Sequence, residues 1–181
     1  MKSGAMPPDR CLELTIRRAE AEDREDLWAI LKPMIRSGET YALPREWGRE
    51  ETLCYWLSPE RTVFVAETEG RTLGTYYLRA NQLGGGGHVA NCGYVTAHDA
   101  SGRGVASAMC THSLQYALAR GFLAMQFNFV VSSNRRAIKL WERLGFETVG
   151  RLPAAFQHPR LGFVDALVMH RLLADASERP I

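Results

Sequence analysis

Several features that would assign this chain to a class at once are absent from its sequence. No apolar run approaches the roughly 20 residues that span a bilayer. Residues 1–10 lack the apolar segment of a secretory signal. The net charge of +2 over 181 residues is too small to predict binding to nucleic acid or to an anionic membrane. Any anion-binding site must therefore be local.

Cysteine is scarce as well. The four cysteines stand at positions 11, 54, 92 and 110, and no two have Cys-x-x-Cys spacing. Neither a zinc site nor a disulfide framework is predicted, no metal is expected, and a reducing cytoplasm is the simplest compartment. Cys92 and Cys110 leave one alternative open, a thiol nucleophile with a histidine partner. Buried, inert thiols are the ordinary case.

What is present is typical of one globular domain. Apolar residues make up 46% of the chain and charged residues 23%. Residues 1–10, with Gly4, Pro7 and Pro8, predict a disordered lead-in, and residues 11–181 predict a single domain with a hydrophobic core.

Hydrophobic periodicity predicts alternating strands and helices, and hence an α/β sheet with helices on both faces. Pro33 is expected to kink or split the first helix, Gly84–Gly87 to form a floppy hairpin tip, and residues 152–161 to be irregular. The expected strands are 12–18, 61–68, 72–79, 88–96, 123–131, 146–150 and 162–172, and the expected helices are 20–36, 50–57, 105–120 and 134–144.

A small-residue loop runs from the strand that ends at Thr96 into the helix that begins at Val105. Gly102 and Gly104 permit positive φ and let a ligand approach the backbone, and Arg103 adds a local positive charge. Free N–H groups and the helix dipole at such an end favour an anion. The loop lacks the Gly-Lys-Ser/Thr of a Walker loop and the third glycine of a dinucleotide fingerprint. The alternative is a plain tight turn.

Two asparagines stand where strands disfavour them. Asn91 lies in the strand over 88–96 and Asn128 in the strand over 123–131, and both strands are expected to be central. An unpaired buried amide costs on the order of 1–3 kcal/mol, so each asparagine needs a partner. Two of them on strands beside the anion loop favour a polar pair aimed at a ligand over satisfied core amides.

Together these segments resemble the GCN5-related N-acetyltransferase (GNAT) superfamily. Its anion loop has the pattern Arg/Gln-x-x-Gly-x-Gly/Ala, which falls here on the residues 101–106, and Ser101 stands where Arg or Gln is usual. Residues 134–146 match its pattern Asn-x-x-Ala-x-x-x-Tyr-x-x-x-Gly-Phe, with Trp141 in place of Tyr.

The resemblance implies a mixed, mostly antiparallel sheet in which the fourth and fifth strands splay apart around acetyl-CoA. A backbone N–H near Gly93 to Val95 would act as oxyanion donor. Because an indole does not give up a proton usefully, Trp141 implies that no tyrosine acid protonates the leaving thiolate here. The implied cofactor-binding residues are Tyr94, Val95, Thr96, Ser101, Gly102, Arg103, Gly104, Val105, Ala106, Asn134, Ala137 and Trp141.

The same segments look like the branch that contains yeast azetidine-2-carboxylate N-acetyltransferase, in which paired strand asparagines line the acceptor site. This implies catalytic and acceptor-binding roles for Asn91 and Asn128. The acceptor would be a small-molecule amine, such as an amino or cyclic imino acid. A closed aromatic pocket from Tyr41, Trp47 and Phe156 would suit it.

Other questions stay open at this point. His88, His98 and Glu39 are candidate bases, and none of them is favoured over a surface role. The alternative functions are a protein or peptide N-acetyltransferase, which an open acidic groove would favour, and an acyl-CoA-binding sensor without turnover. Dimers are usual among relatives, so a homodimer is expected by analogy.

Overall fold

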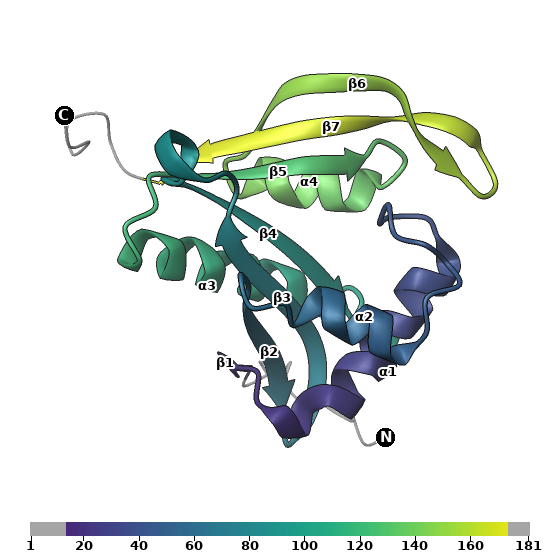
Figure 1. Ribbon diagram of the computed structural model, residues 1–181, viewed down its shortest axis with the longest axis vertical. Coiled ribbons are helices and arrows are strands. Elements are labelled where there is room, and N and C mark those ends of the chain that lie inside the picture. Colours follow the sequence, from purple (N-terminus) through teal and green to yellow (C-terminus); the bar gives the residue numbers. More distant parts are fainter. Residues whose placement is uncertain (1–13, 174–181) are drawn as a thin grey trace, which may run out of the picture.

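The computed structural model describes residues 14–173, and Figure 1 shows a twisted sheet with helices packed against it. The predicted lead-in and residues 12–13 of the first expected strand lie outside the described residues. The strands are β1 (Thr15–Arg18), β2 (Thr62–Thr68), β3 (Arg71–Ala80), β4 (Val89–Thr96), β5 (Ala124–Val131), β6 (Glu147–His158) and β7 (Gly162–Leu172), and the helices are α1 (Arg24–Ser37), α2 (Arg49–Trp56), α3 (Val105–Ala119) and α4 (Arg135–Arg143).

The seven strands form one sheet in the order β1-β2-β3-β4-β5-β7-β6. Every neighbouring pair is antiparallel except β4 and β5, which run parallel. The helix α3 connects these two strands, as a crossover between parallel strands requires. The predicted mixed, mostly antiparallel sheet is therefore confirmed.

One face of the sheet is covered by α1 and α2. Leu27, Leu31 and Leu53 are completely buried there, and Trp56 is 1% exposed. Pro33 does not split α1, which continues through it to Ser37, so that part of the expectation is wrong. The apolar side chains on either side of the proline hold the helix against the sheet, and this packing outweighs the one hydrogen bond that proline removes.

The opposite face is covered by α3 and α4. Met109 and Cys110 of α3 are completely buried, and Trp141 of α4 packs into the same cluster with Phe127 of β5. This cluster and the one under α1 and α2 confirm that helices cover both faces.

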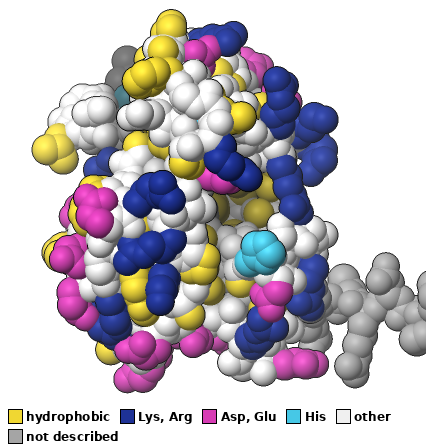
Figure 2. Space-filling view, turned by 90° about the vertical axis from the view of Figure 1, so that its right-hand side faces the viewer, with side chains coloured by type: hydrophobic (Ala, Val, Ile, Leu, Met, Phe, Trp, Pro, Cys, Tyr) yellow, Lys and Arg dark blue, Asp and Glu magenta, His cyan; other side chains and the backbone are white. Residues whose placement is uncertain are grey.

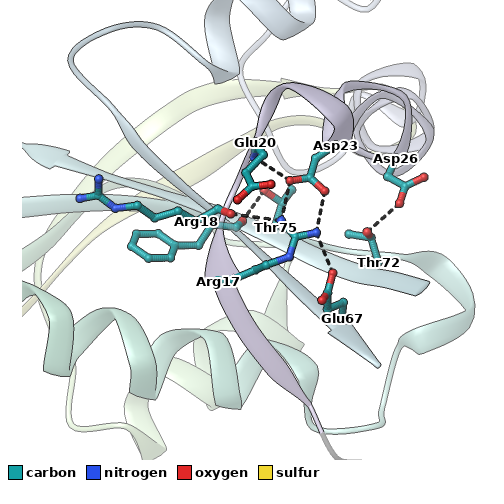
Figure 3. Close-up of polar contacts among 9 residues, drawn as sticks. Arg17, Arg18, Glu20, Asp23, Asp26, Glu67, Thr72 and Thr75 are labelled. Atoms are coloured by element: carbon teal, nitrogen blue, oxygen red, sulfur yellow. Dashed lines mark hydrogen bonds and ion pairs between the residues drawn. The ribbon is translucent and has the colours of Figure 1, made fainter. Parts of the chain in front are cut away.

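A charged network fixes the start of α1 against the sheet edge (Figure 3). The guanidinium of Arg17 in β1 donates to both carboxylate oxygens of Asp23 at 2.8 Å and to Glu67 of β2 at 2.8 Å. The Asp23 carboxylate also accepts from the backbone N–H of Glu20 at 2.7 Å. The hydrogen bonds from Arg17 lower the pKa of the buried Asp23.

The strand β6 differs more from the prediction than the other elements do. It was expected to end at Gly150 with residues 152–161 irregular, but it continues to His158 and pairs with β7 almost to the turn. Extra residues on β6 shift the register between Thr148 and Gly150 and again between Leu152 and Phe156. These bulges break the two-residue alternation on which a strand prediction depends.

The glycine run between β3 and β4 also takes a definite form. Gly84–Gly86 makes a single 3₁₀ turn, and the N–H of Gly87 donates to the carbonyl of Gly84 at 3.0 Å. The run therefore connects the two strands as a turn.

Candidate functional site

The strands β4 and β5 separate after a short start. They pair only at Val89 with Ala124 and at Ala90 with Met125, and Figure 1 shows them diverging beyond that point. Where the backbone ladder ends, the side-chain amide of Asn91 donates to the carbonyl of Gln126 at 2.9 Å. This side chain takes the place of a strand partner at the base of the gap. The splayed fourth and fifth strands predicted from the sequence are confirmed.

A cavity of about 730 Å³ occupies the gap. Residues of β4 and β5, the start of α3, one side of α4 and the loop over 40–43 line it. Figure 2 shows the hollow on the side toward which both strands run, with apolar side chains within it and with Lys, Arg, His and acidic side chains around its rim. The volume lies in the range of small-molecule and cofactor sites, about 300–1,000 Å³.

Backbone groups of β4 face this cavity. At one end of the β3–β4 pair, the N–H of Asn81 donates to the carbonyl of Val89 at 2.7 Å. At the other end, the N–H of Ala97 donates to the carbonyl of Leu73 at 2.8 Å. Antiparallel strands alternate, so the odd-numbered residues of β4 bond β3 and the backbone of Tyr94 is turned toward the gap. The Tyr41 hydroxyl donates to the carbonyl of Tyr94 at 3.1 Å, in agreement with this direction.

A second set of free donors lies at the start of α3. Gly102 and Gly104 have φ of 89° and 81°, as the loop sequence predicted. The first bond of the helix runs from the N–H of Ala108 to the carbonyl of Gly104 at 3.0 Å. The three preceding amides, of residues 105–107, therefore lack a backbone acceptor and lie in the wall of the cavity.

Arg136 was missed by sequence reasoning. It extends from α4 to the α3 loop, where its Nη1 donates to the Ser101 hydroxyl at 2.6 Å, and it lines the cavity. Ser101 is the position at which the GNAT pattern has Arg or Gln. A guanidinium is therefore supplied to that point by another helix, and only the folded chain reveals this.

Asn134 caps α4, because its Oδ1 accepts the N–H of Ala137 at 3.3 Å. Asn134, Ala137 and Trp141 all lie along the cavity wall. The α4 side of the predicted cofactor site is thus brought to the same cavity as the α3 loop. Of the predicted cofactor-binding residues, Arg103 alone is not part of the lining.

The two predicted asparagines lie on the sheet face that carries α1 and α2, and both line the cavity. The Asn128 amide donates to Oδ1 of Asn81 at 2.6 Å, and its own Oδ1 accepts from Gln126 at 2.8 Å. A β-bulge adds one residue to β5 opposite β7 at this point, and bulges re-aim side chains. Both asparagines thus have hydrogen-bond partners as well as a place in the wall.

The three aromatic residues predicted for an acceptor pocket do not come together. Tyr41 lines the cavity, but Trp47 and Phe156 lie outside its lining. Trp47 packs against Tyr55, with ring centroids 5.7 Å apart, and Phe156 packs against Phe129 at 6.2 Å. Tyr55 and Tyr77, which sequence reasoning did not select, supply aromatic lining in their place.

No acid or imidazole lines the cavity among the described residues, so His88, His98 and Glu39 all lie outside its wall. Burial raises the pKa of the Cys92 thiol above its usual range and that of Cys110 to about 12, as expected for inert thiols. Within residues 14–173, no group of three or more His, Cys, Asp or Glu side chains is placed to hold a metal.

Comparison with known proteins agrees with this geometry. The family model "Acetyltransferase (GNAT) family" matches residues 24–146. A GCN5-related N-acetyltransferase structure from Kribbella flavida is 38% identical, covers 88% of this chain and 97% of its own, and superposes with a TM-score of 0.84. No helix in the part of the chain described here is long and apolar enough to cross a membrane.

Two further relatives extend the comparison. N-acetyltransferase aca1 of Schizosaccharomyces pombe is 25% identical over 90% of this chain and 91% of its own length. A Salmonella typhimurium structure, yncA with its cofactor acetyl-CoA, is 18% identical over 93% of this chain and 98% of its own, with a TM-score of 0.80, and shares the fold. The chain belongs to the acetyltransferase (GNAT) family, and it is an acetyl-CoA-dependent N-acetyltransferase.

Proposed function

We propose that this enzyme transfers the acetyl group of acetyl-CoA to the amine of a small molecule, such as an amino or cyclic imino acid, by direct attack on the thioester. The observation that carries the proposal is the gap between β4 and β5, which has free backbone donors along β4 and at the start of α3. The cofactor pyrophosphate would bind at the predicted loop over 102–106, where Val105 and Ala106 have amides without a backbone acceptor. The pantetheine arm would extend along β4 like an added strand.

The alternation along β4 selects one oxyanion donor. Of the residues 93–95, only Tyr94 turns its backbone N–H toward the gap. Attack by the amine forms the new N–C bond and places negative charge on the thioester oxygen, which the Tyr94 N–H would stabilise. The C–S bond then breaks, the nitrogen loses its proton to water, and water later protonates the thiolate.

The lack of a base in the wall suits an amine that needs little help. An α-amino group has a pKa of about 8, so a useful fraction of it is neutral at cellular pH. A lysine side chain, with a pKa of about 10.4, is almost fully protonated there and needs a base to remove its proton. Placing the amine beside the thioester would then supply most of the acceleration. The absence of acidic lining among the described residues also favours a small acceptor over a basic protein segment.

Release of CoA thiol tests the proposal directly. The enzyme is incubated with acetyl-CoA and a panel of small amines, amino acids and imino acids. At least one of these acceptors should cause release of CoA thiol and gain the mass of one acetyl group, about 42 Da. A chain that binds acetyl-CoA tightly and turns over no amine would be an acyl-CoA sensor. Acetylation of peptides alone would favour the protein N-acetyltransferase.

Replacing Asn128 with Ala is expected to reduce kcat about 10- to 100-fold and to leave acetyl-CoA affinity within about twofold, since small misplacements of reacting groups cost this much. The change removes a side chain that lines the acceptor side and holds Asn81 and Gln126. Steady-state kinetics and calorimetry measure the two quantities. Asn81→Ala removes only the hydrogen bond between Asn128 and Asn81 and keeps the Asn128 side chain. An equal effect of both variants would show that this hydrogen bond, and not the Asn128 amide itself, is what the reaction needs.

Replacing Arg136 with Gln is expected to weaken acetyl-CoA binding about tenfold or more, because a charge-assisted hydrogen bond to phosphate contributes about 1.5–3 kcal/mol. Arg135→Gln is the matched control, since Arg135 neighbours Arg136 on α4 and is exposed outside the cavity wall. Calorimetric titration checks both variants. If Arg136→Gln binds acetyl-CoA as the native chain does, Arg136 does not contact the phosphates.

A further inference from the structure

Arg79 of β3 is a cation without a partner at the edge of the cavity. It pairs in register with Asn91 of β4, so the two side chains lie next to each other on the face that carries α1 and α2. Arg79 lines the cavity, and its Nε is buried without a hydrogen-bond partner in the described part of the chain. It belongs to none of the ion pairs found among residues 14–173.

A second arginine close by, Arg61, also has a buried Nε without a hydrogen-bond partner, but the rest of its guanidinium is engaged. Arg61 lies between the rings of Tyr55 and Tyr77, with its Cζ 3.8 Å and 4.3 Å from their centroids. It also donates to the Tyr55 carbonyl at 2.5 Å, and it does not line the cavity. Stacking and this hydrogen bond give Arg61 a structural role, whereas Arg79 has no comparable contact.

The charges around the cavity divide into two groups. Among the described residues, its ionic lining consists of Arg79, Arg136 and Arg143, with no carboxylate. Arg136 and Arg143 belong to α4, on the side of the α3 loop, while Arg79 lies across the gap beside Asn91. The pKa of the exposed Glu60 carboxyl is lowered by hydrogen bonds from its own backbone N–H and from Ser58 and by the charges of Arg61 and Arg79, and Glu60 forms its ion pair with Arg61.

We infer that Arg79 binds a carboxylate of the acceptor, so that the acceptor is a small amine bearing an acid group. This inference rests on the proposed function. The buried Nε of Arg79 is costly to leave without a hydrogen-bond acceptor, and the planar fork of a guanidinium matches a carboxylate. Asn91 is the strand partner of Arg79, and Tyr94 lies three residues further along β4. At about 3.3 Å per residue, the backbone of Tyr94 is about 10 Å from that of Asn91. This spacing suits an acceptor whose amine and carboxylate are separated by few bonds.

The variant Arg79→Met tests the inference because it keeps the apolar stem and removes the fork. The acceptor for this test is an amino acid found by the thiol-release panel. Its kcat/KM is expected to fall about 100-fold or more, because the variant leaves the acceptor carboxylate without its guanidinium partner in a site built to pair with it. With the carboxamide of the same acceptor, kcat/KM is expected to change less than threefold. Arg120→Met, at the exposed end of α3, is the matched control and should alter neither value.

A similar loss for the acid and for its amide would overturn the inference, and so would equal use of both by the native enzyme. The proposed function fails separately, if the native chain binds acetyl-CoA and turns over no amine. In that case calorimetric binding of amino acids to the CoA-saturated protein decides the role of Arg79. Binding of the acid that Arg79→Met abolishes supports it, and an absence of such binding in the native protein rejects it.

Discussion

Replacing Gly104 with Asp is expected to abolish acetyl-CoA binding. The residue precedes α3 with φ of 81°, where any L side chain is strained by about 1–2 kcal/mol. The new carboxylate would also stand at the amides proposed to hold the pyrophosphate. Two like charges 4 Å apart repel by about 4 kcal/mol at an effective dielectric constant of 20, which is roughly a 1,000-fold loss of affinity. Calorimetry with acetyl-CoA measures it.

Gly104→Ala separates strain from charge. A Cβ at this position meets no atom within 4 Å, so the alanine variant carries the backbone strain without a clash and without a negative charge. Its loss of affinity should stay at or below about 30-fold, which is what about 2 kcal/mol of strain would cost, and far below that of the aspartate variant. Unchanged acetyl-CoA affinity in Gly104→Asp, with the fold intact by circular dichroism, would refute the assignment of the loop.

Replacing Trp56 with Ala is expected to lower the free energy of unfolding by about 4 kcal/mol, as large aromatic deletions in a core do. Trp56 is 1% exposed, and its indole N–H donates to the Thr75 hydroxyl at 3.1 Å. Its ring packs edge-on against Tyr77, with centroids 4.9 Å apart, and against Tyr41 at 6.0 Å. For a chain of this length, such a loss lowers the Tm by about 8–16 °C.

Trp56→Phe is the control for this prediction. It keeps an aromatic ring beneath Tyr41 and Tyr77 and removes the indole N–H, so it should cost less than half as much as the alanine. Chemical denaturation of the three proteins gives the free energies. A loss of under about 1 kcal/mol for the alanine variant would contradict the role of Trp56 in supporting the two cavity tyrosines.

Much of the site could be predicted from the sequence because its signals are local. Gly102 and Gly104 with a following helix predict free amides, and the regular spacing of apolar residues predicts a helix over 134–144. The structure has these features as predicted, with Asn134 at the cap and Gly145 at φ of 80°. Each is decided by the conformational preferences of a few consecutive residues.

Other features depend on partners far away in the chain. Arg136 reaches Ser101 across 35 positions, and Arg79 meets the gap only because β3 pairs with β4 in one register. Trp47 and Phe156 were expected in the acceptor pocket because they are aromatic residues in apparent loops. In the folded chain Phe156 belongs to β6 and Trp47 packs against Tyr55, so other aromatic side chains line the cavity.

The sequence by itself determined the family, the order of most strands and helices, and the anion loop, because each of these depends on residues that are adjacent or regularly spaced in the chain. Only the tertiary structure decided how far β6 extends, which backbone amide of β4 faces the gap, and which arginines surround the cavity. The physical reason is that register, bulges and the meeting of distant side chains are set by the packing of the whole sheet and its helices. A local pattern carries no record of that packing.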